Sequence, residues 1–165
     1  MACVSTVAEI EAFCGGINAA GLDRELAITG IDNLVTIAAA TNHVISTDIT
    51  YRVSPAGKFY RWGFAKKDAS YESERDPETG LWKTTIKIFI QKLESGKTKI
   101  LNDQTGENLV AIVPDRNGNK RLIGSLTNGC MITVKEVTNP ANGYEVQILW
   151  ESAYAPYFYT GAITY

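Results

Sequence analysis

Three oxygen-bearing side chains alternate within the stretch VPDRNGNKRLIG, residues 113–124, and these are Asp115, Asn117 and Asn119. Alternating carboxylate and amide oxygens followed by a glycine are typical of the first ligands of a calcium-binding loop. A complete loop of the EF-hand type also needs glycine at its sixth position and a bidentate glutamate at its twelfth. Counted from Asp115, those positions hold Lys120 and Leu126, and Arg121 adds a second positive charge that would repel a cation. The stretch is therefore a poor candidate for a metal site.

The same stretch is typical of a tight turn between two β-strands. Asn117-Gly118 is a favoured pair for a type I′ turn, because both central residues of that turn need positive φ. The apolar segments LVAIV and LIGSL flank the pair, so we predict a β-hairpin with a charged tip. We expect this tip to contact another subunit rather than a ligand, through Arg116, Lys120 and Arg121.

Residues that could support catalysis are few and scattered. His43 is the only histidine, and it lies in ATNHVIS, where a turn between two strands is expected. No glycine-rich phosphate-binding motif occurs. Cys3, Cys14 and Cys130 show no CxxC spacing, so we expect reduced, partly buried thiols rather than disulfides or a zinc site. The sequence predicts a protein that is not an enzyme and that binds no cofactor or metal.

Two aromatic-rich segments could form binding surfaces. KFYRWGF, residues 58–64, interleaves basic and aromatic side chains that could stack on bases or sugars. The favoured interpretation is a strand with Tyr60, Trp62 and Phe64 in the core. In the C-terminal tail, residues 154–165, docking against a neighbouring subunit and packing in the core both remain open. Its candidate contact residues are Tyr157, Phe158 and Tyr159.

The segment DASYESERDPETG, residues 68–80, has the least strand-like composition after the first residues of the chain. Acidic side chains alternate along it and surround one arginine. We predict a long exposed insert, a hairpin tip or arm, that is either solvated or docks on a basic face of another subunit. The candidate contact residues are Glu72, Glu74, Arg75, Asp76 and Glu78.

The remaining patterns indicate a single β-rich domain that spans residues 1–165. Thr6 and Glu9 have capping-box spacing, which predicts a short helix within an N-terminal arm, residues 1–20. LWKTTIKIFIQKL, residues 81–93, alternates with period two from Trp82 to Ile90 and predicts a strand with one buried face. Further strands are predicted at 34–40, 44–51, 58–64, 107–113, 120–126, 130–137 and 144–153. Eight or nine short strands favour an antiparallel β-sandwich or partial barrel with a short flanking helix.

The overall composition narrows the classes of function. The chain of 165 residues is 45% hydrophobic, which is enough for a substantial core. Sixteen basic and eighteen acidic residues give a formal net charge of −2, and this balance argues against a protein that binds nucleic acid through a basic face. No segment approaches the length of apolar sequence needed to cross a membrane, and no secretion signal is apparent.

Four segments carry turn and strand patterns rather than chemical signatures: GGINAAGLDRELAITGIDNLVTI, LNDQTGENLVAIVPDRNGNKRLIG, NGCMITV and GYEVQILWESAYAPYF. They cover most of the chain, from about Gly15 to Phe158. These segments resemble virion structural proteins from crAss-like and related phages of Bacteroidota. This family is similar to tail-tube or tail-ring proteins.

The resemblance implies a tail-tube-like fold and a structural role in a virion that is assembled in the host cytoplasm. Six or twelve copies would form a ring of the tail or neck, beside other tail or neck proteins, around a channel for DNA ejection. The strand at 81–93 could then give one face to the channel, and the insert at 68–80 could be a stacking arm. A near-neutral charge suits a channel through which DNA slides. The alternative is a module that binds carbohydrate or recognises the host through Tyr60, Trp62 and the C-terminal tyrosines.

Overall fold

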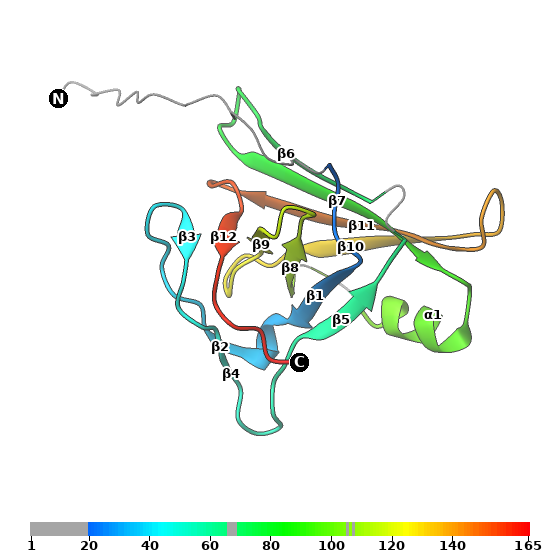
Figure 1. The fold of residues 1–165 in the computed structure, drawn as a ribbon, viewed down its shortest axis with the longest axis horizontal. Helices are drawn as coiled ribbons and strands as arrows, with labels where there is room; N and C mark the ends of the chain where they lie inside the picture. The colour runs from blue at the N-terminus through cyan, green and yellow to red at the C-terminus, as the bar shows by residue number, and fades with distance from the viewer. Residues whose placement is uncertain (1–19, 66–68, 105, 107) are drawn as a thin grey trace.

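A computed structural model of the chain describes residues 20–65, 69–104, 106 and 108–165 (Figure 1). The predicted N-terminal helix and two of the cysteines, Cys3 and Cys14, lie outside the described residues. Within the described part, the chain is mainly β, with antiparallel sheets and a single short α-helix, α1 (Ser95–Asn102).

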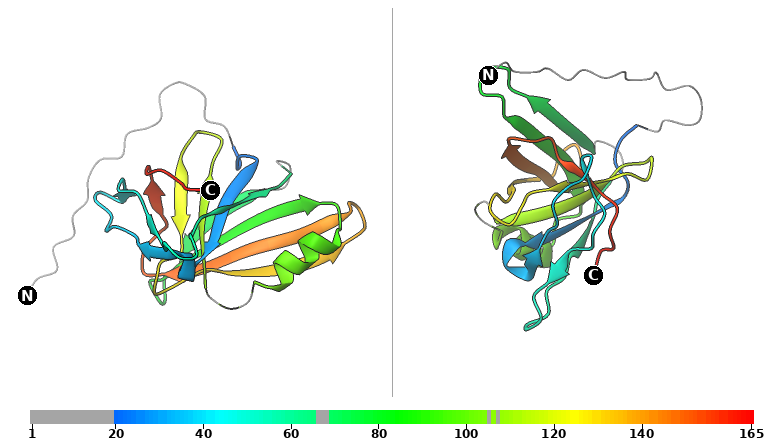
Figure 2. Two further views of the ribbon diagram at one scale, coloured as in Figure 1. Left: turned by 90° about the horizontal axis from the view of Figure 1, so that it is seen from below. Right: turned by 90° about the vertical axis from the view of Figure 1, so that its left-hand side faces the viewer.

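The strands form two main sheets and a small one (Figures 1 and 2). In spatial order, the six-stranded sheet contains β3 (Val44–Ile45), β12 (Tyr157–Tyr159), β9 (Lys120–Ile123), β8 (Leu109–Pro114), β1 (Glu25–Gly30) and β5 (Tyr60–Gly63). The four-stranded sheet contains β10 (Met131–Val137), β11 (Gly143–Ser152), β7 (Trp82–Gln91) and β6 (Ser70–Arg75). The small sheet pairs β2 (Leu34–Thr36) with β4 (Thr50–Tyr51). Among the described strand pairs, only β12 with β3 is parallel.

The main core lies between the two large sheets. Alternate residues of β7 and β11, such as Ile86 and Ile148, are fully buried there against Ile28 and Ala111 of the other sheet. A second core lies on the far face of the six-stranded sheet, under the loops of residues 31–59 and the C-terminal segment. The strand β8 contributes to both cores, because its neighbouring residues point to opposite faces and all of Leu109–Val113 is buried.

The two large sheets approach each other at two corners. The N–H of Ala65, just after β5, donates to the carbonyl of Phe89 on β7 at 2.9 Å. Leu109 at the start of β8 forms an isolated bridge with Cys130, just before β10. These links curve the sandwich into a partial barrel that does not close, and they confirm the predicted fold class. The flanking helix in the described part of the chain is α1, at residues 95–102.

Strand predictions were most accurate where one face is buried and the other exposed. The period-two strand at 81–93 is confirmed as β7, with Thr84, Ile86 and Ile88 buried. The predicted strand at 44–51 is wrong in length, because only its two ends, β3 and β4, pair with other strands. Tyr60 was also wrongly assigned to the core: it is 51% exposed, whereas Phe59 is buried in the second core.

The hairpin predicted at VPDRNGNKRLIG is confirmed, but its turn type is not. Within residues 115–119 only Gly118 has positive φ, +85°, whereas a type I′ turn needs two such residues. The N–H of Gly118 donates to the carbonyl of Asp115 at 3.3 Å, and the N–H of Asp115 donates to the carbonyl of Asn119 at 2.8 Å. The Asp115 carboxylate accepts from the backbone N–H groups of Asn117 and Asn119 at 2.8 and 2.9 Å. Its oxygens therefore organise the turn.

The acidic insert contains a strand that the sequence analysis missed. Residues 70–75 form β6, which pairs with β7 along its whole length, and only residues 76–80 form a projecting turn. Tyr71 and Ser73 face the core side, where Ser73 bonds the hydroxyl of Thr84 at 3.0 Å. The prediction of a long exposed insert between strands over 68–80 is therefore wrong for residues 70–75, which form an edge strand, although a hairpin tip is present.

Cys130 is expected to be unreactive in the folded protein. Its thiol is fully buried and donates to the carbonyl of Leu109 at 3.2 Å, and burial raises its pKa from about 9 to about 12. In a Cys3→Ser/Cys14→Ser variant at pH 8, an aromatic disulfide reagent should label Cys130 only after urea is added.

The same pKa shift predicts a pH dependence of stability. The unfolded thiol loses its proton near pH 9, before the folded thiol does, so ionisation favours the unfolded chain. The free energy of unfolding should fall as the pH rises from about 9 towards 12, and this fall should be smaller in Cys130→Ala. Rapid labelling without urea, or an equal fall in both proteins, would contradict the burial of this thiol.

Candidate subunit interface

The four-stranded sheet has two open edges, formed by β6 and β10. β6 pairs only with β7, from Ser70 opposite Lys87 to Arg75 opposite Trp82. β10 pairs only with β11. On their other sides, β6 and residues 132–137 of β10 make no backbone hydrogen bond to any described residue. Rows of unpaired N–H and C=O groups are templates for pairing with another chain.

The side of this sheet that faces away from the main core is a polar surface, called here the outer face. Charged side chains of both signs cover it, and all seven are exposed. Lys135 lies 3.9 Å from Glu145, across one strand pair. The seven are Lys83, Lys87, Lys135, Glu72, Glu74, Glu145 and Glu151.

The two open edges are offset along the strand direction. Val134, in the middle of β10, is level with Ile88 of β7 through their shared neighbour Val146. The middle of β6 is level with Thr84 and Thr85. The offset is about three to four residues, or roughly 12 Å at the rise of a β-strand. A sheet that continued from one edge to the other would therefore run obliquely to its strands.

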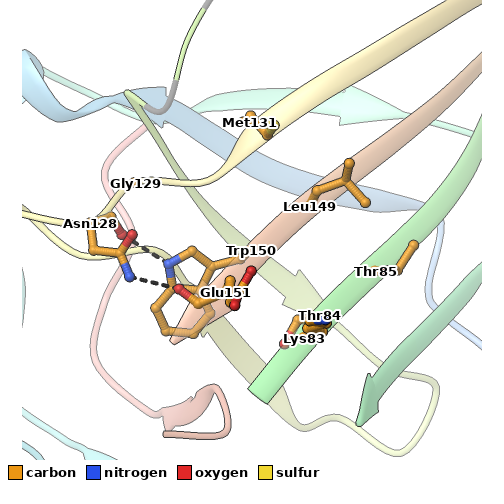
Figure 3. Close-up of a pocket in the computed structure, with 9 residues that line it drawn as sticks. All are labelled: Lys83, Thr84, Thr85, Asn128, Gly129, Met131, Leu149, Trp150 and Glu151. Atoms are coloured by element: carbon orange, nitrogen blue, oxygen red, sulfur yellow. Dashed lines mark hydrogen bonds between the residues drawn. The ribbon is translucent and has the colours of Figure 1, made fainter. Parts of the chain in front are cut away.

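A notch marks the start of the β10 edge, where β11 extends past its neighbour (Figure 3). It has a volume of about 300 Å³ and is lined by Met131, Leu149, Thr85 and the turn of Asn128 and Gly129. The side-chain amide of Asn128 donates to the carbonyl of Glu151 at 2.8 Å, and the indole N–H of Trp150 donates to the carbonyl of Asn128 at 2.9 Å. These bonds fix the turn that forms the wall of the notch.

The acidic residues predicted as contacts lie on the β6 edge and its turn. Glu72 and Glu74 project from the outer face, and Glu78 is exposed in the turn. Asp76 accepts from the N–H of Glu78 at 2.9 Å and from Lys83 Nζ at 3.3 Å. The backbone N–H of Glu78, followed by Lys83, lowers the pKa of this carboxyl. Asp76 therefore stays ionised and holds the turn in place.

Two of the basic residues predicted at the hairpin tip, Arg116 and Arg121, bind within their own subunit. Arg116 Nε donates to the carbonyl of Leu22 at 3.2 Å. Arg121 lies with its guanidinium 3.7 Å from the ring centre of Phe158 and donates to the carbonyl of Pro156 at 3.1 Å. Burial raises the pKa of Tyr71, which lies on the other side of Arg121, and the arginine charge opposes that rise. Lys120 is half-buried at the start of β9.

Of the C-terminal aromatic residues, Tyr159 is part of the core, and Tyr157 and Phe158 pack against their own subunit. Tyr159 is 1% exposed; its hydroxyl donates to the carbonyl of Ala162 at 2.6 Å and accepts from the N–H of Ile49 at 3.2 Å. The prediction of Tyr159 as a subunit contact is therefore wrong, because its side chain fills the second core. Phe158 is half-buried under Arg121, and Tyr157 is half-buried against the ring of His43, 4.6 Å away between centroids.

Tyr60 and Trp62, the candidate sugar-binding aromatics, line a different part of the molecule. They border a cavity of about 500 Å³ between β1, β5 and α1, together with Asp32, Gln104 and Asn108. The C-terminal tyrosines named with them in the alternative hypothesis are not among its lining residues. The structure therefore does not assemble the full aromatic platform of that hypothesis.

The comparisons with known proteins add no family to this description. No family model, no curated protein and no solved structure matches the chain. Within the described ranges, no group of three or more His, Cys, Asp or Glu side chains is placed to hold a metal ion. No described helix is long and apolar enough to cross a membrane.

Proposed function

We propose that this chain is a structural subunit of a phage tail or neck ring, in which the four-stranded sheets of neighbouring copies join into one continuous wall. The observation that carries the proposal is the pair of open, offset edges on β6 and β10. Pairing these edges between copies would satisfy their backbone groups and remove the exposed edges.

The strand directions suit a ring with simple rotational symmetry. The four strands alternate in direction, so β6 and β10 run in opposite directions. When one copy is placed beside another in the same orientation, β6 of the second copy lies antiparallel to β10 of the first. Such a contact is head-to-tail and generates a closed ring when the rotation between copies closes.

The offset of the edges also suits a closed wall. Strands in a barrel tilt by about 35–45° from its axis. An offset of roughly 12 Å across three strand spacings of about 4.8 Å corresponds to a tilt of roughly 40°. With six copies, a wall of about 24 strands would have a diameter of roughly 45 Å between backbones, and twelve copies would double it.

The outer face has the charge expected for the lining of a DNA channel. Three lysines and four glutamates are interspersed on it, so neither sign dominates. A strongly basic lining would bind the phosphate backbone and slow its passage, whereas a balanced one does not. The opposite face of the sheet is buried in the main core, which leaves the outer face to line the channel.

Assembly of the purified protein tests the proposal. Negative-stain electron microscopy and analytical ultracentrifugation of the concentrated full-length chain should reveal rings or stacked rings with a central hole. A chain that stays monomeric at the highest concentration reached would contradict it. If that monomer also bound glycans on an array, and the Trp62→Ala variant did not, a carbohydrate-binding module would replace the ring subunit as the better explanation.

A further inference from the structure

We propose a specific register for the seam between copies: β6 of each copy pairs antiparallel with β10 of the next copy so that Glu72 lies opposite Lys135. This inference rests on the proposed ring, and it identifies the residues that hold the ring together. In this register Glu74 lies opposite Thr133, and Ser70 lies opposite Val137.

The burial pattern restricts the choice of register. On β10, Ile132 and Val134 face the main core, while Thr133 and Lys135 face outward. On β6, Tyr71 faces the core and Glu72 faces outward. Directly paired residues lie on the same face of the sheet, so outward residues must oppose outward residues. Registers shifted by one residue are therefore excluded. The allowed registers therefore differ by steps of two residues.

Among the allowed registers, the proposed one gives the most complete pairing. All six residues of β6 then oppose residues 132–137 of β10, and only Met131 of β10 lies beyond β6. A slip of two residues in either direction places at least one β6 residue opposite a residue outside β10, either Cys130 or residues 138–139. It also places Lys135 opposite either Ser70 or Glu74.

The charges along the seam agree with this choice. Glu72 is an exposed carboxylate on one edge, and Lys135 is an exposed ammonium on the other. The present partner of Lys135, Glu145, is 3.9 Å away and more than half exposed, so Lys135 can reach a second carboxylate. Opposite charges directly across an antiparallel pair stabilise it, and like charges destabilise it.

The geometry of a closed wall provides an independent check. Within one copy, Glu72 and Met131 are level with each other, because both are level with Thr85 of β7. Pairing Glu72 with Lys135 of the neighbour instead displaces the next copy by about four residues, or roughly 13 Å along the strands. Across four strands, about 19 Å, this displacement gives a tilt of roughly 35°, which lies in the range that barrels adopt.

The register also gives the notch at the start of β10 an occupant. Continuing the pairing by one residue places Asp76 of the next copy beside Met131. The exposed turn of residues 76–80 of that copy then lies next to Asn128 and Gly129, which line the notch. Figure 3 shows this side of the sheet, with Met131 at the start of β10 and Leu149 on the neighbouring strand β11.

Disulfide trapping in assembled rings tests the register. In a Cys3→Ser/Cys14→Ser background, the pair Lys135→Cys and Glu72→Cys should give a ladder of crosslinked copies on a non-reducing gel after mild oxidation. Directly opposite residues have Cα atoms about 4.5–5.5 Å apart, within the reach of a disulfide. The matched pairs Lys135→Cys with Glu74→Cys, and Lys135→Cys with Ser70→Cys, should not crosslink, because their Cα atoms would be about 8 Å apart.

A charge exchange provides the second arm of the experiment. Lys135→Glu should raise the protein concentration needed for assembly about fivefold, and adding Glu72→Lys should restore it. The matched charge reversal Lys87→Glu, on the outer face but on the inner strand β7, should leave that concentration unchanged. Failure of Glu72→Lys to rescue Lys135→Glu would overturn the pairing.

The outcomes separate this inference from the proposed function. Rings that form but crosslink through Glu74→Cys or Ser70→Cys would overturn the register and leave the ring subunit intact. Crosslinking of Glu72→Cys alone into dimers would indicate a two-fold β6–β6 contact and overturn the seam. A wild-type chain that forms no rings would overturn both.

Discussion

Replacing Ile112 by alanine is expected to lower the free energy of unfolding by about 3–4 kcal/mol, within the range seen for buried isoleucines. Ile112 is 1% exposed and projects from β8 into the second core, beside Leu122 and Phe59. The strand on which it lies is buried on both faces and flanked by β1 and β9. The backbone there cannot move inward to fill the space, so most of the cavity should remain. Urea denaturation followed by tryptophan fluorescence measures the loss.

The free energy of unfolding of Ile112→Ala should be compared with that of Ile148→Ala, a matched substitution in the main core. Both substitutions should shift a single unfolding transition, because β8 belongs to both cores and should couple them. Val35→Ala, at a position that is 54% exposed, serves as the control and should change the free energy of unfolding little. A separate early transition in Ile112→Ala alone would contradict the coupling. It would mean that the second core unfolds as an independent unit.

The fold class followed from period-two alternation, and the clearest example is β7. Its inward residues are tryptophan, threonine and isoleucine and its outward residues are mostly polar, so one strand and both of its faces could be predicted from the sequence. β8 is different, because a run such as LVAIV shows that a segment is buried but not which neighbours bury it. Its role in two cores became evident only from the pairing with β1 and β9.

The missed strand β6 shows how an edge strand can look like a loop. Tyr71 and Ser73 face the core, and two of the three outward positions, Glu72 and Glu74, are carboxylates. Charged side chains are common on exposed edges because they discourage unwanted pairing. The alternation of acidic residues at 72, 74 and 76 was itself a period-two signal, although its lack of apolar residues favoured an irregular segment.

The candidate interface could be predicted only in part. The composition of the insert predicts Glu72 and Glu74 as subunit contacts, but nothing in the sequence predicts Lys135. A lysine within a strand pattern does not indicate whether the strand lies at the edge of a sheet. Edge position, offset and register depend on the order of strands in the sheet. That order is set by contacts between residues far apart in the chain, and no local pattern encodes it.

A chain that ends at Ala155 is expected to lose its cooperative fold, and this prediction decides what the aromatic C-terminus does. The removed residues form β12, which pairs with both β3 and β9. They also close the second core, where Tyr159 is buried. The N–H of Phe59 would lose its bond to the carbonyl of Thr164, and the N–H of Ile49 would lose the hydroxyl of Tyr159. The truncation exposes one face of the second core and leaves backbone groups unpaired. Together these losses should exceed the free energy of unfolding of a small domain.

Circular dichroism and urea denaturation of the truncated chain measure the outcome, beside Tyr154→Ala as the control. Tyr154 is 60% exposed and belongs to the same aromatic segment, so this variant should unfold like the parent. If the C-terminal aromatics served chiefly to dock a neighbouring subunit, the truncated chain would instead fold normally and fail only to assemble. A truncated chain with an unchanged urea midpoint would therefore overturn the assignment of these residues to the core. Loss of the unfolding transition, with Tyr154→Ala unaffected, would assign the residues after Ala155 to the fold of the subunit itself.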